Sequence, residues 1–130
     1  SIDDIFKLSS MVENTELKGL IESQLNKYQL YLKTDEGKNV LYKNFNNKIE
    51  KIDKGGAFVE KLKDMYKQFC SKDIPIKELL LIGSGLLYFI TPIDIIPDFI
   101  FPIGFLDDII AIKIVLDMLD KIRNKPNYKE

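Results

Sequence analysis

Apolar residues recur at spacings of three and four along most of this 130-residue chain, a pattern typical of amphipathic helices. No stretch shows the strict alternation or the β-branched clusters of a strand. The fold class expected is therefore all-α, a small bundle of antiparallel helices joined by short loops. Before residue 72, four helices are expected. The first covers residues 1–14, the second begins at Thr15 and is ended by Asp35-Glu36-Gly37, the third runs from Lys38 to Asp53, and the fourth runs from Ala57 to Ser71.

The apolar faces of these helices predict the side chains of the core. They comprise Leu17, Leu20, Ile21, Leu25, Tyr28, Tyr31 and Leu32, then Val40, Leu41, Phe45, Ile49 and Ile52, then Phe58, Val59, Leu62, Met65, Tyr66, Phe69 and Cys70. Cys70 is the only cysteine, so it cannot form an internal disulfide. We expect it to be a small core residue.

A helix that is apolar nearly all round is predicted to end at Ile90, with Asp73 as its cap and Pro75 in its first turn. Its Gly83-Ser84-Gly85 patch would let another helix approach closely. The last helix, which Asp107 or Asp108 begins, is expected to run from Ile109 to about Arg123. Its apolar face would consist of Ile109, Ile112, Val115, Leu116 and Leu119.

These two helices would form a central apolar hairpin, broken at Thr91-Pro92 and again across Pro97–Gly104. Thr91 fits the cap of a further short helix, Pro92 its first position, and Asp94 its third. The polar tail, residues 124–130, is expected to fray. The hairpin is therefore the predicted centre of a single domain of residues 1–130.

Four acidic side chains lie inside this apolar stretch: Asp94, Asp98, Asp107 and Asp108. A buried carboxylate is costly unless it is paired, hydrogen-bonded, metal-bound or protonated. If the loop folds back, the four could converge and bind a divalent cation such as Mg²⁺ or Ca²⁺. In the simpler interpretation, which we favour, they cap helices and accept hydrogen bonds from backbone amides, and no cofactor is needed.

The composition excludes several classes of function. The chain has no histidine, which removes Ser-His-Asp and Cys-His catalysis and histidine-containing zinc sites. Its net charge of −1 argues against nucleic-acid binding, which usually requires an excess of lysine and arginine. These absences favour a protein that is not an enzyme.

The central motif resembles the signature of the YkvA-like family of domains of unknown function. The matching residues are Tyr88-Phe89-Ile90-Thr91-Pro92-Ile93-Asp94-Ile95-Ile96-Pro97-Asp98 and Gly104-Phe105-Leu106-Asp107-Asp108. They follow the pattern of a tyrosine, Pro-x-Asp-x-x-Pro-Asp and Gly-x-x-Asp-Asp, with Tyr88, Thr91, Pro92, Pro97 and Gly104 as the structural positions. The resemblance extends over residues 41–123, with residues 1–40 as a helical extension, and Pro102 lies one place later than the family pattern expects.

The resemblance implies a bacterial, helical and often membrane-associated protein without an established activity. The segment from Leu79 to Ile90 would extend about 18 Å, which is short of a hydrocarbon core of about 30 Å. Lysines flank the apolar hairpin on both sides, so both of its ends would stay on the cytoplasmic side. The hairpin is therefore either a re-entrant membrane segment or, as we favour, the core of a soluble protein.

Three functions remain open from the sequence. The favoured one is a non-enzymatic helical interaction module with a protein partner, in the cytoplasm or at the inner face of the cell membrane. The second is a metal-dependent enzyme that uses Asp94, Asp98, Asp107 and Asp108. The third is a dedicated protein-binding partner, such as an immunity or antitoxin protein, with specificity from residues 1–40.

Overall fold

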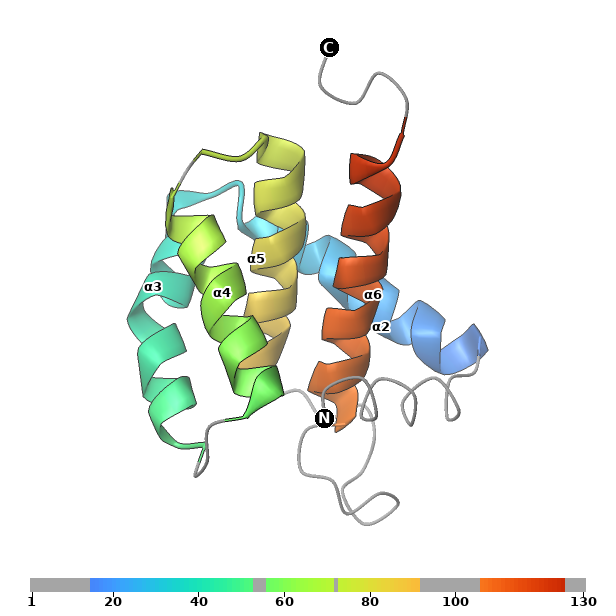
Figure 1. Ribbon diagram of the computed structural model, residues 1–130. Helices are drawn as coiled ribbons and strands as arrows, with labels where there is room; N and C mark the ends of the chain where they lie inside the picture. Colours follow the sequence, from blue (N-terminus) through green and yellow to red (C-terminus); the bar gives the residue numbers. More distant parts are fainter. Residues whose placement is uncertain (1–14, 53–55, 72, 92–105, 126–130) are drawn as a thin grey trace.

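The computed structural model describes residues 15–52, 56–71, 73–91 and 106–125 (Figure 1). These residues form five helices and no strand, so the all-α prediction is confirmed for them. The helices are α2 (Thr15–Tyr31), α3 (Asp35–Glu50), α4 (Ala57–Ser71), α5 (Ile76–Ile90) and α6 (Leu106–Arg123). The helix predicted for residues 1–14 lies outside the described residues, as do the motif segment, residues 92–105, and the tail beyond residue 125.

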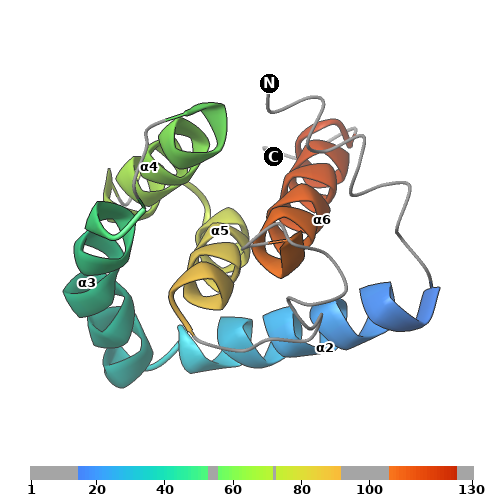
Figure 2. The ribbon, with the colours of Figure 1, turned by 90° about the horizontal axis from the view of Figure 1, so that it is seen from below.

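Helix α5 is the centre of the bundle. Figure 2 shows it between α6 on one side and the α3–α4 pair on the other, with α2 running across α5 and α6. Ten successive residues of α5, from Leu80 to Phe89, are buried, as the apolar sequence on every side of this helix predicts. The expected central hairpin is present as the antiparallel pair of α5 and α6 (Figure 1).

Two glycines allow other elements to approach α5 closely, as the small-residue patch predicts. A Cβ atom at Gly83 would lie 2.6 Å from Leu32 Cδ1 and 2.7 Å from Phe69 Cε1. On the side facing α6, a Cβ atom at Gly85 would lie 3.1 Å from both Ile112 and Val115. Leu32, directly after α2, and helices α4 and α6 therefore pack directly against the α5 backbone.

The junction of α2 and α3 differs from the prediction. Asp35, Glu36 and Gly37 were expected to end the second helix, but they form the first turn of α3. Thr34 caps this helix, because its side-chain oxygen accepts a 3.0 Å hydrogen bond from the Gly37 N–H. The acidic pair then lies at the helix N-terminus, where negative charge is favourable.

Three residues lie elsewhere than the sequence predicts. Cys70 is exposed, because one residue turns α4 by about 100°, so Cys70 does not face the core as the buried Phe69 does. Leu20, next to the buried Ile21, is 54% exposed for the same reason. Asp73 does not cap α5, which begins after Pro75 without a side-chain hydrogen bond at its cap.

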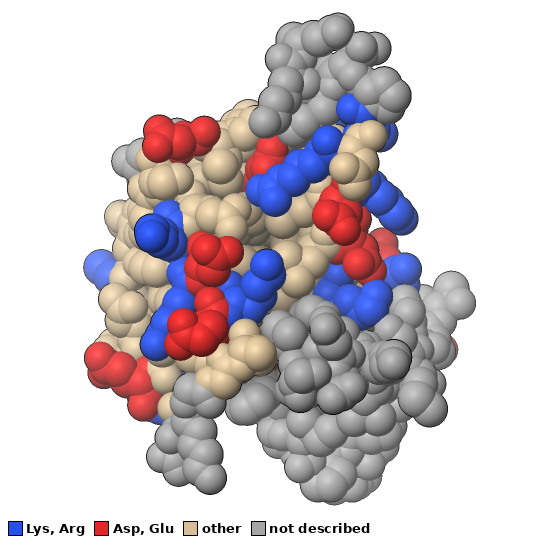
Figure 3. Space-filling view, viewed as in Figure 1, with Lys and Arg blue, Asp and Glu red and all other residues tan. Residues whose placement is uncertain are grey.

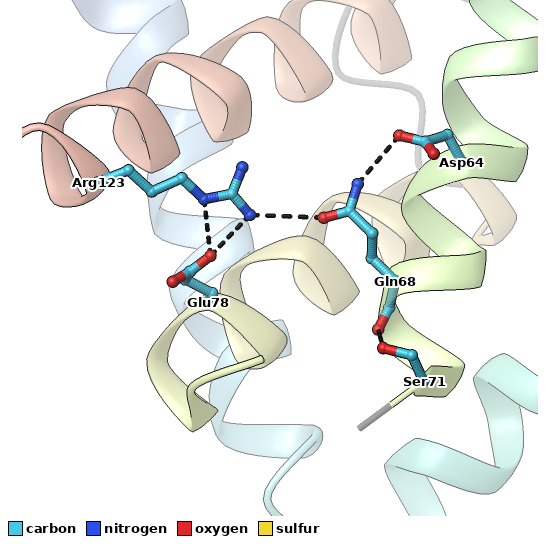
Figure 4. A network of polar contacts seen from close by, with 5 residues as sticks. All are labelled: Asp64, Gln68, Ser71, Glu78 and Arg123. Atoms are coloured by element: carbon cyan, nitrogen blue, oxygen red, sulfur yellow. Dashed lines mark hydrogen bonds and ion pairs between the residues drawn. The ribbon is translucent and has the colours of Figure 1, made fainter. Parts of the chain in front are cut away.

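A polar network connects α4, α5 and α6 at the end where α5 begins (Figure 4). Glu78 is only 3% exposed, and its Oε1 atom accepts hydrogen bonds from Nε and Nη2 of Arg123 at 2.7 and 2.6 Å. The same guanidinium donates a 3.4 Å hydrogen bond to Gln68, whose amide donates to Asp64 at 3.0 Å. This pairing holds the end of α6 against the start of α5 and satisfies a buried carboxylate.

The described helices include none that is both long and apolar enough to cross a membrane. Helix α5 has 15 residues and is about 22 Å long. Its apolar side chains contact the other four helices of the bundle, so in this structure the hairpin supplies the core.

Gly37 gives a test of the α2–α3 junction. An added Cβ atom would overlap the carbonyl oxygen of Tyr31, which belongs to the backbone and has little freedom to move. We expect Gly37→Ala to lower the free energy of unfolding by about 2–3 kcal/mol, measured by urea denaturation. The matched control is Gly19→Ala in α2, where a Cβ atom meets nothing within 4 Å and a gain of about 0.5–1 kcal/mol is expected. Equal effects at the two positions would contradict this account.

Candidate functional site

The candidate site lies where the last turn of α5 meets the first turn of α6. The hydroxyl of Tyr88 donates a hydrogen bond to Oδ2 of Asp107 at 3.4 Å. Tyr88 is 1% exposed and Asp107 is 6% exposed, so both groups lie inside the bundle. The apolar face that begins at Ile109 packs α6 against α5, which orients Asp107 towards Tyr88.

The position of Asp107 in the first turn of α6 stabilises its negative charge, because the free amides of a helix N-terminus carry partial positive charge. Asp108 follows it and is half-buried. Burial raises the pKa of Tyr88, and the charges of Asp107 and Asp108 and the hydrogen bond to Asp107 raise it further. Tyr88 therefore remains a neutral hydrogen-bond donor at every physiological pH.

A second tyrosine reaches this region from α2. The Tyr28 ring contacts the Tyr88 ring edge to face, with centroids 6.4 Å apart and planes at 83°. The hydroxyl of Tyr28 is buried and has no hydrogen-bond partner among the described residues. The region thus combines two carboxylates with two phenols at one end of an apolar core.

The structure places only part of the predicted site. Asp107 and Tyr88 are together, and Asp108 is close enough to affect the pKa of Tyr88. Thr91 ends α5, with its N–H bonded to the Leu87 carbonyl. The other predicted positions, Asp94, Asp98, Pro92, Pro97 and Gly104, lie outside the described residues.

The predicted cation site stays a prediction. Within the described ranges, no three potential ligands from histidine, cysteine, aspartate or glutamate lie close enough to hold a metal ion. Two of the four predicted carboxylates, Asp94 and Asp98, are not among these residues. Of the four, only Asp107 and Asp108 have a described environment: both lie in the first turn of α6, and Asp107 accepts a hydrogen bond from the Tyr88 hydroxyl.

Sequence reasoning missed two parts of the buried polar structure. Tyr28 was predicted only as a member of an apolar face, although a tyrosine there brings a hydroxyl into the core. The pairing of Glu78 with Arg123 was also missed. A glutamate on a helix that is apolar all round was the available signal, because such a charge requires a partner.

Tyr88→Phe tests the buried hydroxyl. In the unfolded chain a tyrosine loses its proton near pH 10, while native Tyr88 keeps its proton because its pKa is raised. The native state therefore binds more protons than the unfolded state above about pH 10, and stability falls there as pH rises. We expect Tyr88→Phe to reduce this decline by up to about 1.4 kcal/mol per pH unit in denaturation experiments.

The control is Tyr42→Phe, which changes a tyrosine at the surface. It should keep most of the alkaline decline. An unchanged decline in Tyr88→Phe would show that Tyr88 ionises as an exposed tyrosine does.

Comparison with known proteins finds similarity in the segment that forms the hairpin. A family model described as a protein of unknown function, DUF1232, matches residues 78–114. Over 60 residues the chain is 35% identical to a protein of Bacillus subtilis (strain 168) named uncharacterized membrane protein YkvA. That match covers 44% of this chain and 57% of the relative. No solved structure is significantly similar to the chain.

Both matches agree with the resemblance that the motif predicts. The matched residues 78–114 include the buried Glu78, Tyr88 and Asp107. They lie within the region of residues 41–123 expected from the sequence. The chain is therefore similar, over residues 78–114, to a family of unknown function, and over 60 residues to YkvA.

Proposed function

We propose that this protein is a non-enzymatic helical interaction module that binds peripherally to the cytoplasmic face of a membrane. The observation that carries the proposal is a contrast. The Bacillus subtilis relative is named a membrane protein, yet the most apolar helix of the matched segment here, α5, is enclosed by four other helices. Contact with a membrane would then be made by the surface of the bundle.

The mixed charges on that surface indicate that a membrane contact would have to be partly apolar. Lysine and arginine side chains alternate with aspartate and glutamate over the described part of the face in Figure 3. The whole chain has a net charge of −1, so long-range attraction to an anionic membrane is weak. Binding would therefore need exposed apolar side chains as well as nearby lysines.

Flotation with lipid vesicles tests this function. The protein should rise through a density gradient with vesicles of phosphatidylcholine and phosphatidylglycerol, and less with phosphatidylcholine alone. Raising the salt concentration should weaken binding without abolishing it, because the apolar contribution is insensitive to screening. A protein that stays at the bottom with every vesicle composition would contradict the proposal.

A second candidate function is binding of a divalent cation beside Asp107. The observation that favours it is the buried Asp107 with the unpartnered Tyr28 hydroxyl in the same region. Calorimetry with Mg²⁺, Mn²⁺ and Ca²⁺ should then give a heat of binding that Asp107→Asn removes. Asp117→Asn, which changes an exposed aspartate of the same helix, is the control and should leave that heat intact. Absence of heat in the unchanged protein would exclude this candidate.

A further inference from the structure

An open groove lies between the start of α3 and the start of α5. Its volume is about 580 Å³. Its apolar lining comes from three helices and a connecting segment: Tyr42, Phe69, Ile74, Ile76 and Leu79; its polar lining consists of Asp35, Lys38 and Asn39. We call this feature the α3–α5 groove. Its volume lies in the range of sites that bind a small molecule or part of one.

The apolar walls of the α3–α5 groove are accessible from outside. Ile76 is 63% exposed and Tyr42 is 36% exposed, so two of the large hydrophobic side chains on the described surface line this groove. Phe69 forms the floor and is 1% exposed, with its ring 5.8 Å from the Tyr42 ring. An occupant would cover apolar surface that now faces water.

The groove is lined by one lysine and one aspartate. Lys38 lies on its rim and is half-buried, and Lys77 follows Ile76 and is exposed. Neither lysine forms an ion pair with another described residue. The acidic residue on the rim, Asp35, lies in the first turn of α3, where the helix amides already stabilise its charge. The Lys38 ammonium group is thus available to an anion at the groove.

We infer that the α3–α5 groove takes an acyl chain of an anionic phospholipid at a bilayer surface, with Lys38 at the phosphate. This rests on the proposed peripheral membrane binding and names the surface that would perform it. A compact ammonium group on a flexible stem suits a phosphate as a point charge, and the stem can lie along apolar surface. The apolar part of the lining, which combines aliphatic and aromatic side chains, suits a lipid chain.

The first test removes the apolar contact. Ile76→Gln should lower the apparent affinity for vesicles of phosphatidylcholine and phosphatidylglycerol about tenfold in the flotation assay, because it removes an apolar side chain from the contact. Leu30→Gln is the matched control, since Leu30 is also 63% exposed but lies on α2. It should bind as the unchanged protein does. Both positions are exposed enough for a polar residue without loss of folding, which circular dichroism would verify.

The second test removes the charge. Lys38→Gln should lower affinity about fivefold for vesicles with phosphatidylglycerol and should have little effect with phosphatidylcholine alone. Lys43→Gln, which changes an exposed lysine of the same helix, is the control.

Cys70 supplies a probe of position. It is exposed, and its thiol is close enough to Tyr42 to add to the effect of burial in raising the Tyr42 pKa. Vesicles that occupy the groove should slow thiol modification of Cys70.

The outcomes separate this inference from the proposed function. If the unchanged protein floats and Ile76→Gln and Lys38→Gln float equally well, peripheral binding stands and the α3–α5 groove is excluded as its surface. If the unchanged protein does not float, both are overturned. If Ile76→Gln abolishes capture of another protein but not flotation, the groove binds a protein segment and the lipid inference is wrong.

Discussion

The burial of α5 on every side is the constraint on which the rest of this bundle depends. Each polar side chain on such a helix must find a partner inside the protein. Glu78 is paired with Arg123, the Ser84 hydroxyl donates to the Leu81 carbonyl at 2.7 Å, and Tyr88 donates to Asp107. Two of these three partners belong to α6. They lie at its opposite ends, so together they fix both the direction and the register of α6 along α5.

The two ends of α5 consequently have different chemistry. At the C-terminal end of α5, a buried polar region lies beside the first turn of α6 and consists of Tyr88, Tyr28 and Asp107. At the start of α5, Ile76 is exposed at the mouth of the α3–α5 groove. Twelve residues of helix, about 18 Å, separate Tyr88 from Ile76. The cation candidate and the proposed lipid contact therefore concern separate places and can be tested independently.

The segment matched by the family model, residues 78–114, contains the groups that pack α5 against α6. Residues 78–114 contain the polar groups Glu78, Tyr88 and Asp107 together with the close approach of α6 to Gly85. These features serve the packing of one helix against another. The proposed membrane contact, by contrast, uses mostly side chains before residue 78, among them Ile76 and Lys38, with Leu79 as the exception.

Helix positions along the chain were determined largely by the sequence. Apolar spacing predicted α4 from Ala57 to Ser71, as observed, and predicted that α5 would be central. Spacing alone left the edges of each apolar face undecided, because one residue turns a helix by about 100°. Cys70 and Leu20 are exposed for that reason. Because Thr34 caps α3, Gly37 lies in the first turn of α3 and not at the end of α2 as predicted.

Partners distant in the chain were decided only by the tertiary structure. Tyr88 and Asp107 are 19 residues apart, and Glu78 and Arg123 are 45 apart. The sequence showed that Asp107 was an acid in apolar surroundings and therefore needed stabilisation. It could not show that the partner would be a phenol from α5, because that depends on how two helices pack. The hydrophobic period determines which residues form a helix, and the packing of whole helices determines which polar groups meet.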